Sequence, residues 1–188
     1  MANQDSAFGL RAIGKIGQNR DAQGLSEYSI AASATAIYQG DPVKALNTGT
    51  IGVAAAGDVL LGSLNGVFYT DPSNKPLWAN HLAAANAATD IVGFVSDDPY
   101  ERFEIQSNNT GASTQTDVFM NYDIAYAAGS SPNFVSKVEL DYATGVSTTN
   151  QLRVIGVSKD PSNNELASAN TNYVVEIVEH FYKQAAGI

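Results

Sequence analysis

Short runs of apolar residues alternate with clusters of Gly, Pro, Asn and Asp along most of the chain, from Leu25 onward. Many of these runs alternate apolar and polar positions with a period of two, which places successive side chains on opposite faces of a strand. The turn clusters recur about every 8–12 residues, a spacing typical of β-sandwiches and β-barrels. The pattern therefore predicts an all-β fold, a barrel or sandwich of short antiparallel strands.

Twelve strands are expected from this pattern. They are at 28–31, 35–39, 42–46, 50–54, 59–64, 66–70, 91–96, 100–106, 117–127, 135–142, 152–158 and 172–181. The last run contains Val174, Val175, Ile177 and Val178, whose branched side chains favour strand over helix. The segment 71–90 interrupts the pattern with a polar turn, the only tryptophan and an alanine-rich stretch, so we expect a mostly irregular loop insertion there.

Residues 1–24 differ from the rest because single large apolar residues stand between glycines. Such a segment is too glycine-interrupted for a stable helix, so an extended N-terminal arm is expected before a body at 25–188. A frayed terminus is the simpler alternative, although a frayed tail seldom carries four large apolar residues. An extended arm can add a strand to the sheet edge of another subunit. The residues expected to anchor it are Phe8, Leu10, Arg11, Ile13, Lys15, Ile16 and Arg20.

Charge is unevenly divided between the two parts. The chain carries a net charge of −9, yet the arm has three basic against two acidic residues, and the body seven against seventeen. An acidic body repels nucleic acid, so no nucleic-acid partner is expected. The absence of cysteine excludes disulfides and thiolate metal sites. No apolar run is long enough to cross a membrane, and the first residues lack the features of a secretory signal.

No set of residues forms a recognisable catalytic or metal-binding motif. His81 and His180 have no second histidine at metal-ligand spacing, and neither a nucleophile elbow nor a phosphate-binding loop is present. The acidic cluster at 97–104 could bind calcium or supply a hydrolytic acid–base pair. Its aspartates precede Pro99 in a turn, and its two glutamates are expected on opposite strand faces, so a structural role is favoured. We therefore expect a protein that is not an enzyme and that binds neither a cofactor nor a metal.

Two further features bear on binding. Trp78 and the nine tyrosines could form a carbohydrate-binding platform, although such residues in β-rich chains are more often half-buried strand or interface residues. Charged residues make up only 15% of the chain. Surfaces that pack permanently against neighbours avoid charge because desolvating a charge is costly. The composition therefore favours a subunit of an assembly.

The segment 28–46, which contains Gly40-Asp41-Pro42-Val43, resembles the small decoration (cement) proteins of tailed-phage heads. The resemblance continues through the Gly-containing turn and short strand at 49–54 and the apolar segment 61–64. The runs 91–95 and 154–157 are similar to the later strands of that family. The insertion at 71–90 departs from the family pattern.

The resemblance implies a β-barrel or β-tulip fold and a homotrimer on the outer surface of the capsid. It further implies a non-enzymatic structural virion protein that stabilises the capsid by bridging subunits of the major capsid protein. In that setting the arm residues named above would contact the shell or a sister subunit. A carbohydrate- or receptor-binding β-domain of a virion fibre or surface protein is the alternative, and a carboxylate-dependent hydrolase is a second rival. The length argues against a complete major shell subunit.

Overall fold

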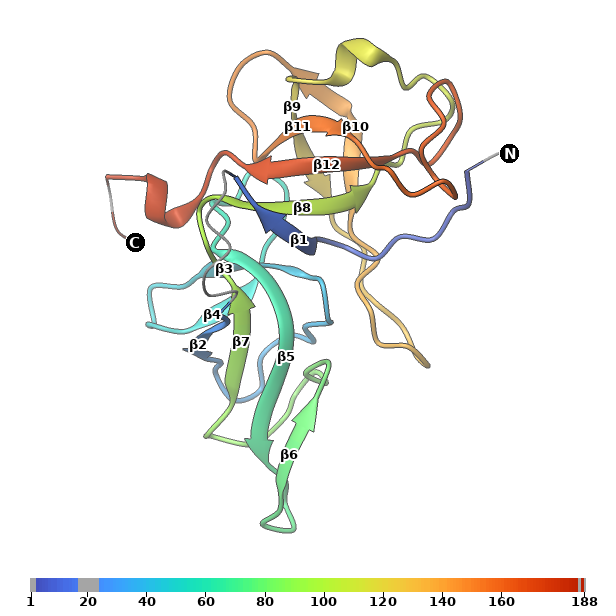
Figure 1. Cartoon of the computed structure of the whole chain (residues 1–188). Helices are drawn as coiled ribbons and strands as arrows, with labels where there is room; N and C mark the ends of the chain where they lie inside the picture. Colours follow the sequence, from blue (N-terminus) through green and yellow to red (C-terminus); the bar gives the residue numbers. More distant parts are fainter. Residues whose placement is uncertain (1–2, 17–23, 186, 188) are drawn as a thin grey trace.

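The computed structural model describes residues 3–16, 24–185 and 187. Within these residues the chain forms two antiparallel sheets of six strands each, which lie one above the other in Figure 1. The expected all-β fold is confirmed. Neither sheet closes on itself, so of the expected architectures the structure is a sandwich-like pair of open sheets and not a barrel.

The first sheet is the upper one in Figure 1. Its strands, in spatial order, are β1 (Arg11–Lys15), β8 (Glu101–Gln106), β12 (Asn172–Ile177), β11 (Leu152–Val157), β9 (Asn121–Ala125) and β10 (Glu139–Val146). Two short 3-10 helices, η1 (Gln115–Asp117) and η2 (Phe181–Lys183), precede β9 and follow β12. The N-terminal strand β1 and the strand β10 are the edges of this sheet.

The second sheet is the lower one. Its strands, in spatial order, are β2 (Ser26–Ser29), β7 (Val92–Ser96), β5 (Gly62–Thr70), β3 (Pro42–Ala45) and β4 (Ile51–Val53), while β6 (Pro76–Ala79) pairs with the far half of β5. The β5–β6 hairpin projects away from the first sheet at the bottom of Figure 1.

Each sheet covers its own apolar core. The core of the first sheet is centred on Phe103, Tyr173 and Leu152, all at most 1% exposed. That of the second sheet includes Leu64 and Val95. Burial of side chains of this size is the main stabilising contribution in each half. The first core also includes Ala54 and Leu60, which follow β4 and precede β5 of the second sheet, so the two halves are in contact there.

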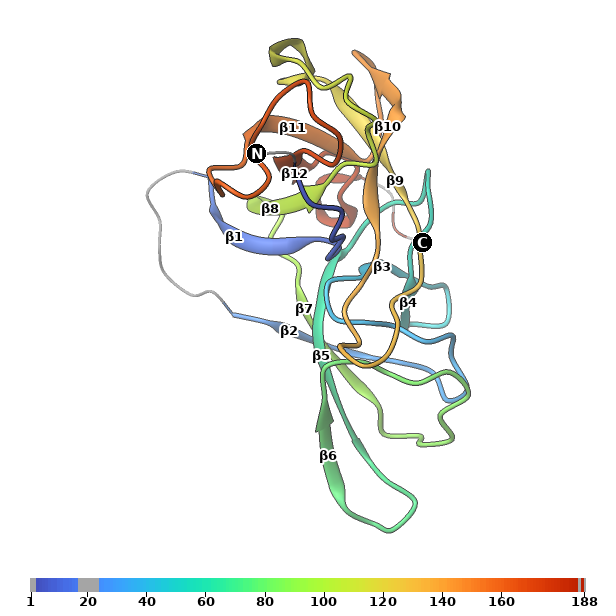
Figure 2. The same ribbon diagram turned by 90° about the vertical axis from the view of Figure 1, so that its right-hand side faces the viewer.

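The N-terminal segment and the turn at Gly40 connect the two halves. The Leu10 N–H donates to the Gly40 carbonyl at 2.8 Å, and the Gly40 N–H donates to the Leu64 carbonyl at 2.7 Å. The Ser63 hydroxyl donates to the Leu10 carbonyl at 2.6 Å. The loop between β9 and β10 also descends beside the second sheet in Figure 2, where Val135 bridges to Gln39.

Several elements differ from those expected. The expected strand at 35–39 contributes only isolated bridges, and the runs at 59–64 and 66–70 join into one long strand, β5, bent by a bulge after Leu64. The insertion at 71–90 contains the strand β6, which sequence alone placed in an irregular loop. The run at 117–127 begins with η1, so β9 is shorter than expected.

Candidate functional site

The N-terminal arm forms an edge strand of its own chain. Strand β1 pairs antiparallel with β8, with Arg11 opposite Glu104 and Lys15 opposite Glu101. A register shift between Ala12 and Gly14 marks a bulge. Among the described residues no strand pairs with the other side of β1.

The expected arm anchors are divided between core and surface. Leu10 is 1% exposed and belongs to the first core, and Phe8 is half-buried. Ile13 and Ile16, by contrast, are 48% and 37% exposed. The expected anchor Arg20 lies outside the described residues. The apolar residues of the arm therefore serve two purposes, since one completes the core and two remain on the surface.

The arm cations pair with carboxylates of the same body. The Arg11 guanidinium forms an ion pair with Glu104 and lies over the Phe8 ring, 4.5 Å from its centroid. The Lys15 ammonium lies 2.5 Å from the Asp98 carboxylate, and this contact lowers the pKa of Asp98. The structure therefore pairs two of the expected anchor cations with carboxylates of their own chain.

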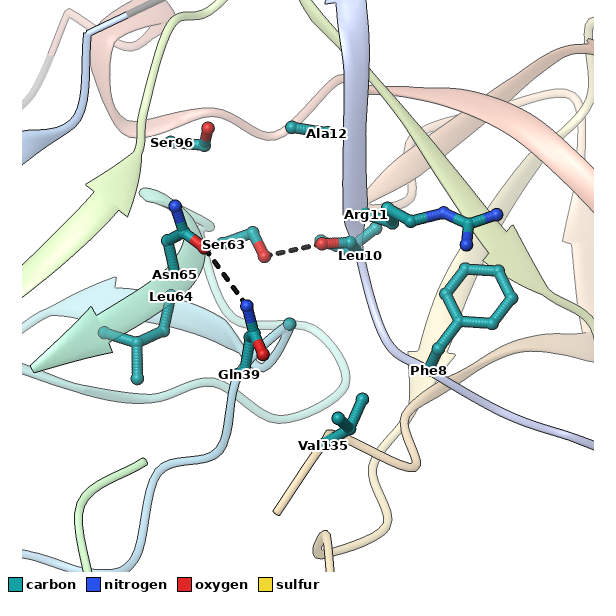
Figure 3. A pocket seen from close by; sticks show the side chains of 11 residues that line it. Phe8, Leu10, Arg11, Ala12, Gln39, Ser63, Leu64, Asn65, Ser96 and Val135 are labelled. Carbon is teal, nitrogen blue, oxygen red and sulfur yellow. Dashed lines mark hydrogen bonds between the residues drawn. The ribbon is translucent and has the colours of Figure 1, made fainter. Parts of the chain in front are cut away.

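A cavity of about 380 Å³, here called the junction cavity, opens where the arm meets the second sheet (Figure 3). Phe8 and Arg11 lie on one side of it, and Gln39 and Asn65 lie on the other. The Gln39 amide donates to the Asn65 side-chain oxygen at 3.2 Å. The lining therefore combines one ring, one cation already paired with Glu104, neutral polar side chains and several aliphatic residues.

Three aromatic rings gather on the outer face of the second sheet. Phe68 lies opposite Trp78 in the β5–β6 register, and Phe94 lies opposite Gly66 in the β5–β7 register. The three rings therefore share one face, because positions two apart on a strand point the same way. Neighbouring Val67 is buried on the opposite, core face.

We call these three rings the aromatic platform. The Trp78 ring stacks on Phe94 with centroids 4.6 Å apart, and its centroid lies 5.4 Å from that of Phe68. Trp78 is nevertheless 65% exposed. Since one face of the indole rests on Phe94, this exposure leaves the other face open to solvent. An exposed stacked tryptophan of this kind is suited to binding a flat, partly apolar ligand.

A second concavity, the platform hollow, lies beside these rings. Its volume is about 430 Å³, and it is lined by Leu25, Asn65, Gly66, Trp78, Ala79, Asn80 and Phe94. Gly66 is on β5, between β7, which carries Phe94, and β6, which carries Trp78. As a glycine it places no side chain between the two rings. None of these lining residues is charged. The platform hollow therefore combines aromatic surface with two side-chain amides.

The acidic cluster at 97–104 is engaged in internal contacts. Asp97 accepts hydrogen bonds from the hydroxyls of Ser26 and Tyr28, and Asp98 accepts one from the Tyr100 N–H at 2.8 Å. Glu104 is buried and accepts from Ser158. Across the part of the chain that the structure describes, no three acidic or histidine side chains come together to hold a metal.

A buried carboxylate that sequence reasoning missed is Asp117. Its oxygens accept hydrogen bonds from the hydroxyls of Tyr122, Tyr142 and Tyr173, at 3.2, 3.1 and 2.8 Å. The Thr114 N–H donates to it as well, at 2.7 Å. Four donors satisfy both oxygens, which is the pattern of a structural group. These tyrosines are far apart in the sequence, so no local pattern indicates the cluster.

The two histidines take up structural positions. His81 lies between the rings of Tyr38 and Phe134, with centroids at 6.0 and 4.0 Å. His180 lies near the end of the expected strand 172–181, and its side chain is fully buried. Burial lowers its pKa to about 4, and its Nδ1 accepts from the Tyr182 N–H at 3.1 Å.

No family model, no curated protein and no solved structure matches this chain. Among the residues described here, no helix is long and apolar enough to cross a membrane. Two candidate sites stand out on the surface of the described residues. One is the outer edge of β1, with Ile13 on the strand and Ile16 directly after it, and the other is the aromatic platform with its hollow.

Proposed function

We propose that this chain is a non-enzymatic structural protein of a virion, which binds the outer surface of a tailed-phage capsid and bridges subunits of the major capsid protein. The observation that carries the proposal is the outer edge of β1, where no further strand pairs among the described residues and where Ile13 and, directly after the strand, Ile16 are exposed. A strand edge with exposed apolar side chains is suited to pairing with another chain.

The energetics of the edge favour such a contact. Covering a half-exposed isoleucine removes apolar surface from water, which contributes on the order of 1 kcal/mol for each side chain. Backbone hydrogen bonds along β1 would set the register of the added strand. In this proposal the chain assembles as a homotrimer on the capsid, and the acidic body faces solvent without attracting nucleic acid.

The test is co-sedimentation of the chain with intact heads from the same source, with the copy number measured relative to the major shell protein. Removing residues 1–24 is a poor probe, because it would also remove Leu10 from the core. We expect the double substitution Ile13→Asp and Ile16→Asp to abolish binding, while Leu77→Asp, at a residue exposed to a similar extent, leaves it intact. A wild-type chain that stays in the supernatant, or a double variant that still binds, would overturn the proposal.

A second candidate function, carbohydrate binding, is favoured by a different observation. Trp78 is 65% exposed and stacked on Phe94, although the hydrophobic effect normally buries a ring of this size. An exposed indole flanked by amides fits the apolar face and the hydroxyls of a sugar ring. Binding of the labelled chain to a printed glycan array tests this candidate, and an array without any bound glycan would refute it.

A further inference from the structure

Asn65 belongs to both concavities of the molecule. It lines the platform hollow together with Trp78, and it lines the junction cavity together with Phe8 and Arg11. The reason is local, since Asn65 sits at the β5 bulge, where the register with β7 shifts between Leu64 and Gly66. A bulge redirects the side chain of the extra residue. The two concavities are therefore adjacent and share one exposed amide.

The amide of Asn65 is held in one orientation. Its oxygen accepts the hydrogen bond from Gln39 at 3.2 Å, as Figure 3 shows, so the amide nitrogen is the group that remains for a ligand. Among the described residues this nitrogen donates no hydrogen bond. A hydroxyl group is a suitable acceptor for it.

The charges around both concavities select against an ionic ligand. The lining of the platform hollow is uncharged. In the junction cavity the cation Arg11 is paired with Glu104. Neither lining contains a carboxylate that would pair with a cation, and the net charge of −9 on the whole chain repels anions. A ligand that fits both concavities is therefore neutral, rich in hydroxyl groups and able to stack on an indole.

We infer that the two concavities form one binding track for a neutral oligosaccharide, running from the Trp78 ring past Asn65 to Phe8. This inference rests on the carbohydrate-binding candidate and adds to it the charge of the ligand, its length and the residues that bind it. One sugar unit stacks on Trp78, and the following units pass the Asn65 amide into the junction cavity. Because the track joins two hollows of about 430 and 380 Å³, it binds a chain of sugars better than a single one.

Trp78 is the only tryptophan, so its fluorescence reports directly on the platform. The probes are maltohexaose, cellohexaose, mannohexaose and chitohexaose, together with the matching monosaccharides. We expect a saturable fluorescence change with at least one hexasaccharide. The matching monosaccharide should bind at least about tenfold more weakly, which corresponds to about 1.4 kcal/mol for the contacts beyond Trp78.

Variants separate the parts of the track, with affinities measured by calorimetry. Trp78→Ala should abolish binding. Phe8→Ala, in the junction cavity alone, should weaken binding of the hexasaccharide while leaving the monosaccharide unchanged, whereas Asn65→Ala removes an amide that lines both concavities and should weaken both ligands. Asn65 is exposed at a bulge, so its substitution is compatible with folding, and a melting curve checks this. Leu77→Ala is the matched control, because Leu77 neighbours Trp78 on β6 and points to the opposite face.

The outcomes of these experiments distinguish the binding track from carbohydrate binding in general. If a hexasaccharide and its monosaccharide bind equally, or if Asn65→Ala and Phe8→Ala have no effect, the track is wrong although carbohydrate binding stands. If no hexasaccharide changes the fluorescence and no glycan on the array binds, both are wrong. If Trp78→Ala instead abolishes self-association in sedimentation experiments without sugar, the platform contacts a second copy and the inference is overturned.

Discussion

Gly9 and Gly40 approach each other so closely that neither position has room for a side chain. A Cβ atom on Gly9 would lie 2.2 Å from the Gly40 carbonyl oxygen, and one on Gly40 would lie 2.5 Å from the Phe8 carbonyl oxygen. Both glycines also have positive φ angles, 73° and 86°. This contact allows the Leu10 N–H to reach the Gly40 carbonyl and joins the arm to the turn between the sheets.

The substitution Gly9→Ala should therefore destabilise the fold by about 3 kcal/mol, since it adds a backbone clash to the strain of positive φ. Gly49→Ala is the matched control. Gly49 has a similar φ of 76° but nothing within 4 Å of its added Cβ, so only the strain of about 1 kcal/mol is expected. Urea unfolding measures both. Equal losses for the two variants would show that the close approach contributes nothing.

The contribution of Asp41 to the stability of the fold increases as the pH falls. Its side chain is fully buried, and burial raises its pKa to about 6 although it accepts from the Tyr38 N–H at 2.8 Å. The folded state therefore binds a proton that the unfolded state, with its lower pKa, releases between about pH 4 and pH 6. We expect Asp41→Asn to be more stable than the wild type at neutral pH. Its advantage should disappear as the pH is lowered through this window, as measured by urea unfolding at each pH.

His180 has the opposite effect. Its folded pKa of about 4 lies below the ordinary value of 6.5, so the unfolded state binds a proton in the interval where the folded state does not. The contribution of His180 to the stability of the wild type therefore falls as the pH is lowered from about 6.5 to 4. His180→Asn keeps an acceptor for the Tyr182 N–H and removes the titrating group. Its stability relative to the wild type should rise on acidification, which is the reverse of the trend for Asp41→Asn, and a parallel pH dependence would refute this assignment.

Asp117 stabilises the first sheet through its three tyrosine partners. Asp117→Asn places an amide group among hydroxyls that all donate, so some of these hydroxyls lose their acceptor. A loss of about 2–4 kcal/mol is expected, from a buried network with unsatisfied groups. Tyr142→Phe removes one hydroxyl at the edge of the cluster, which lies 2.7 Å from the Ala112 carbonyl oxygen and 3.1 Å from Asp117, and it should cost about 1 kcal/mol. If the two variants unfold at the same urea concentration, the network around Asp117 contributes no more to stability than a single hydrogen bond does.

The alternation of side chains was sufficient to predict the all-β fold and the position of most strands. The expected strand 91–96 corresponds to β7, and 152–158 corresponds to β11 within one residue at either end. The segment 71–90 was predicted less well, because an alanine-rich stretch carries no period-two signal. Pro76 at the start of β6 is compatible with a strand at a sheet edge, but it does not indicate one.

The site was only partly visible in the sequence. The apolar residues of the arm were identified, but an edge strand pairs through its backbone, so the sequence does not indicate which sheet Leu10 packs against. Arg11 and Lys15 were expected as anchors of the arm, and the structure pairs them with Glu104 and Asp98 of the same chain. Trp78 was recognised as a candidate, while its contact with Phe94 depends on strand pairing between distant segments.

The order of synthesis gives the pairing of β1 with β8 a further consequence. Arg11 and Glu104 are 93 positions apart, so β1 leaves the ribosome long before β8, the strand with which it pairs. Until then Leu10 has no sheet to cover it, and closing so long a loop is slow. A neighbouring copy offers the same β8 edge. The share of chains that exchange this strand during refolding should therefore increase with protein concentration.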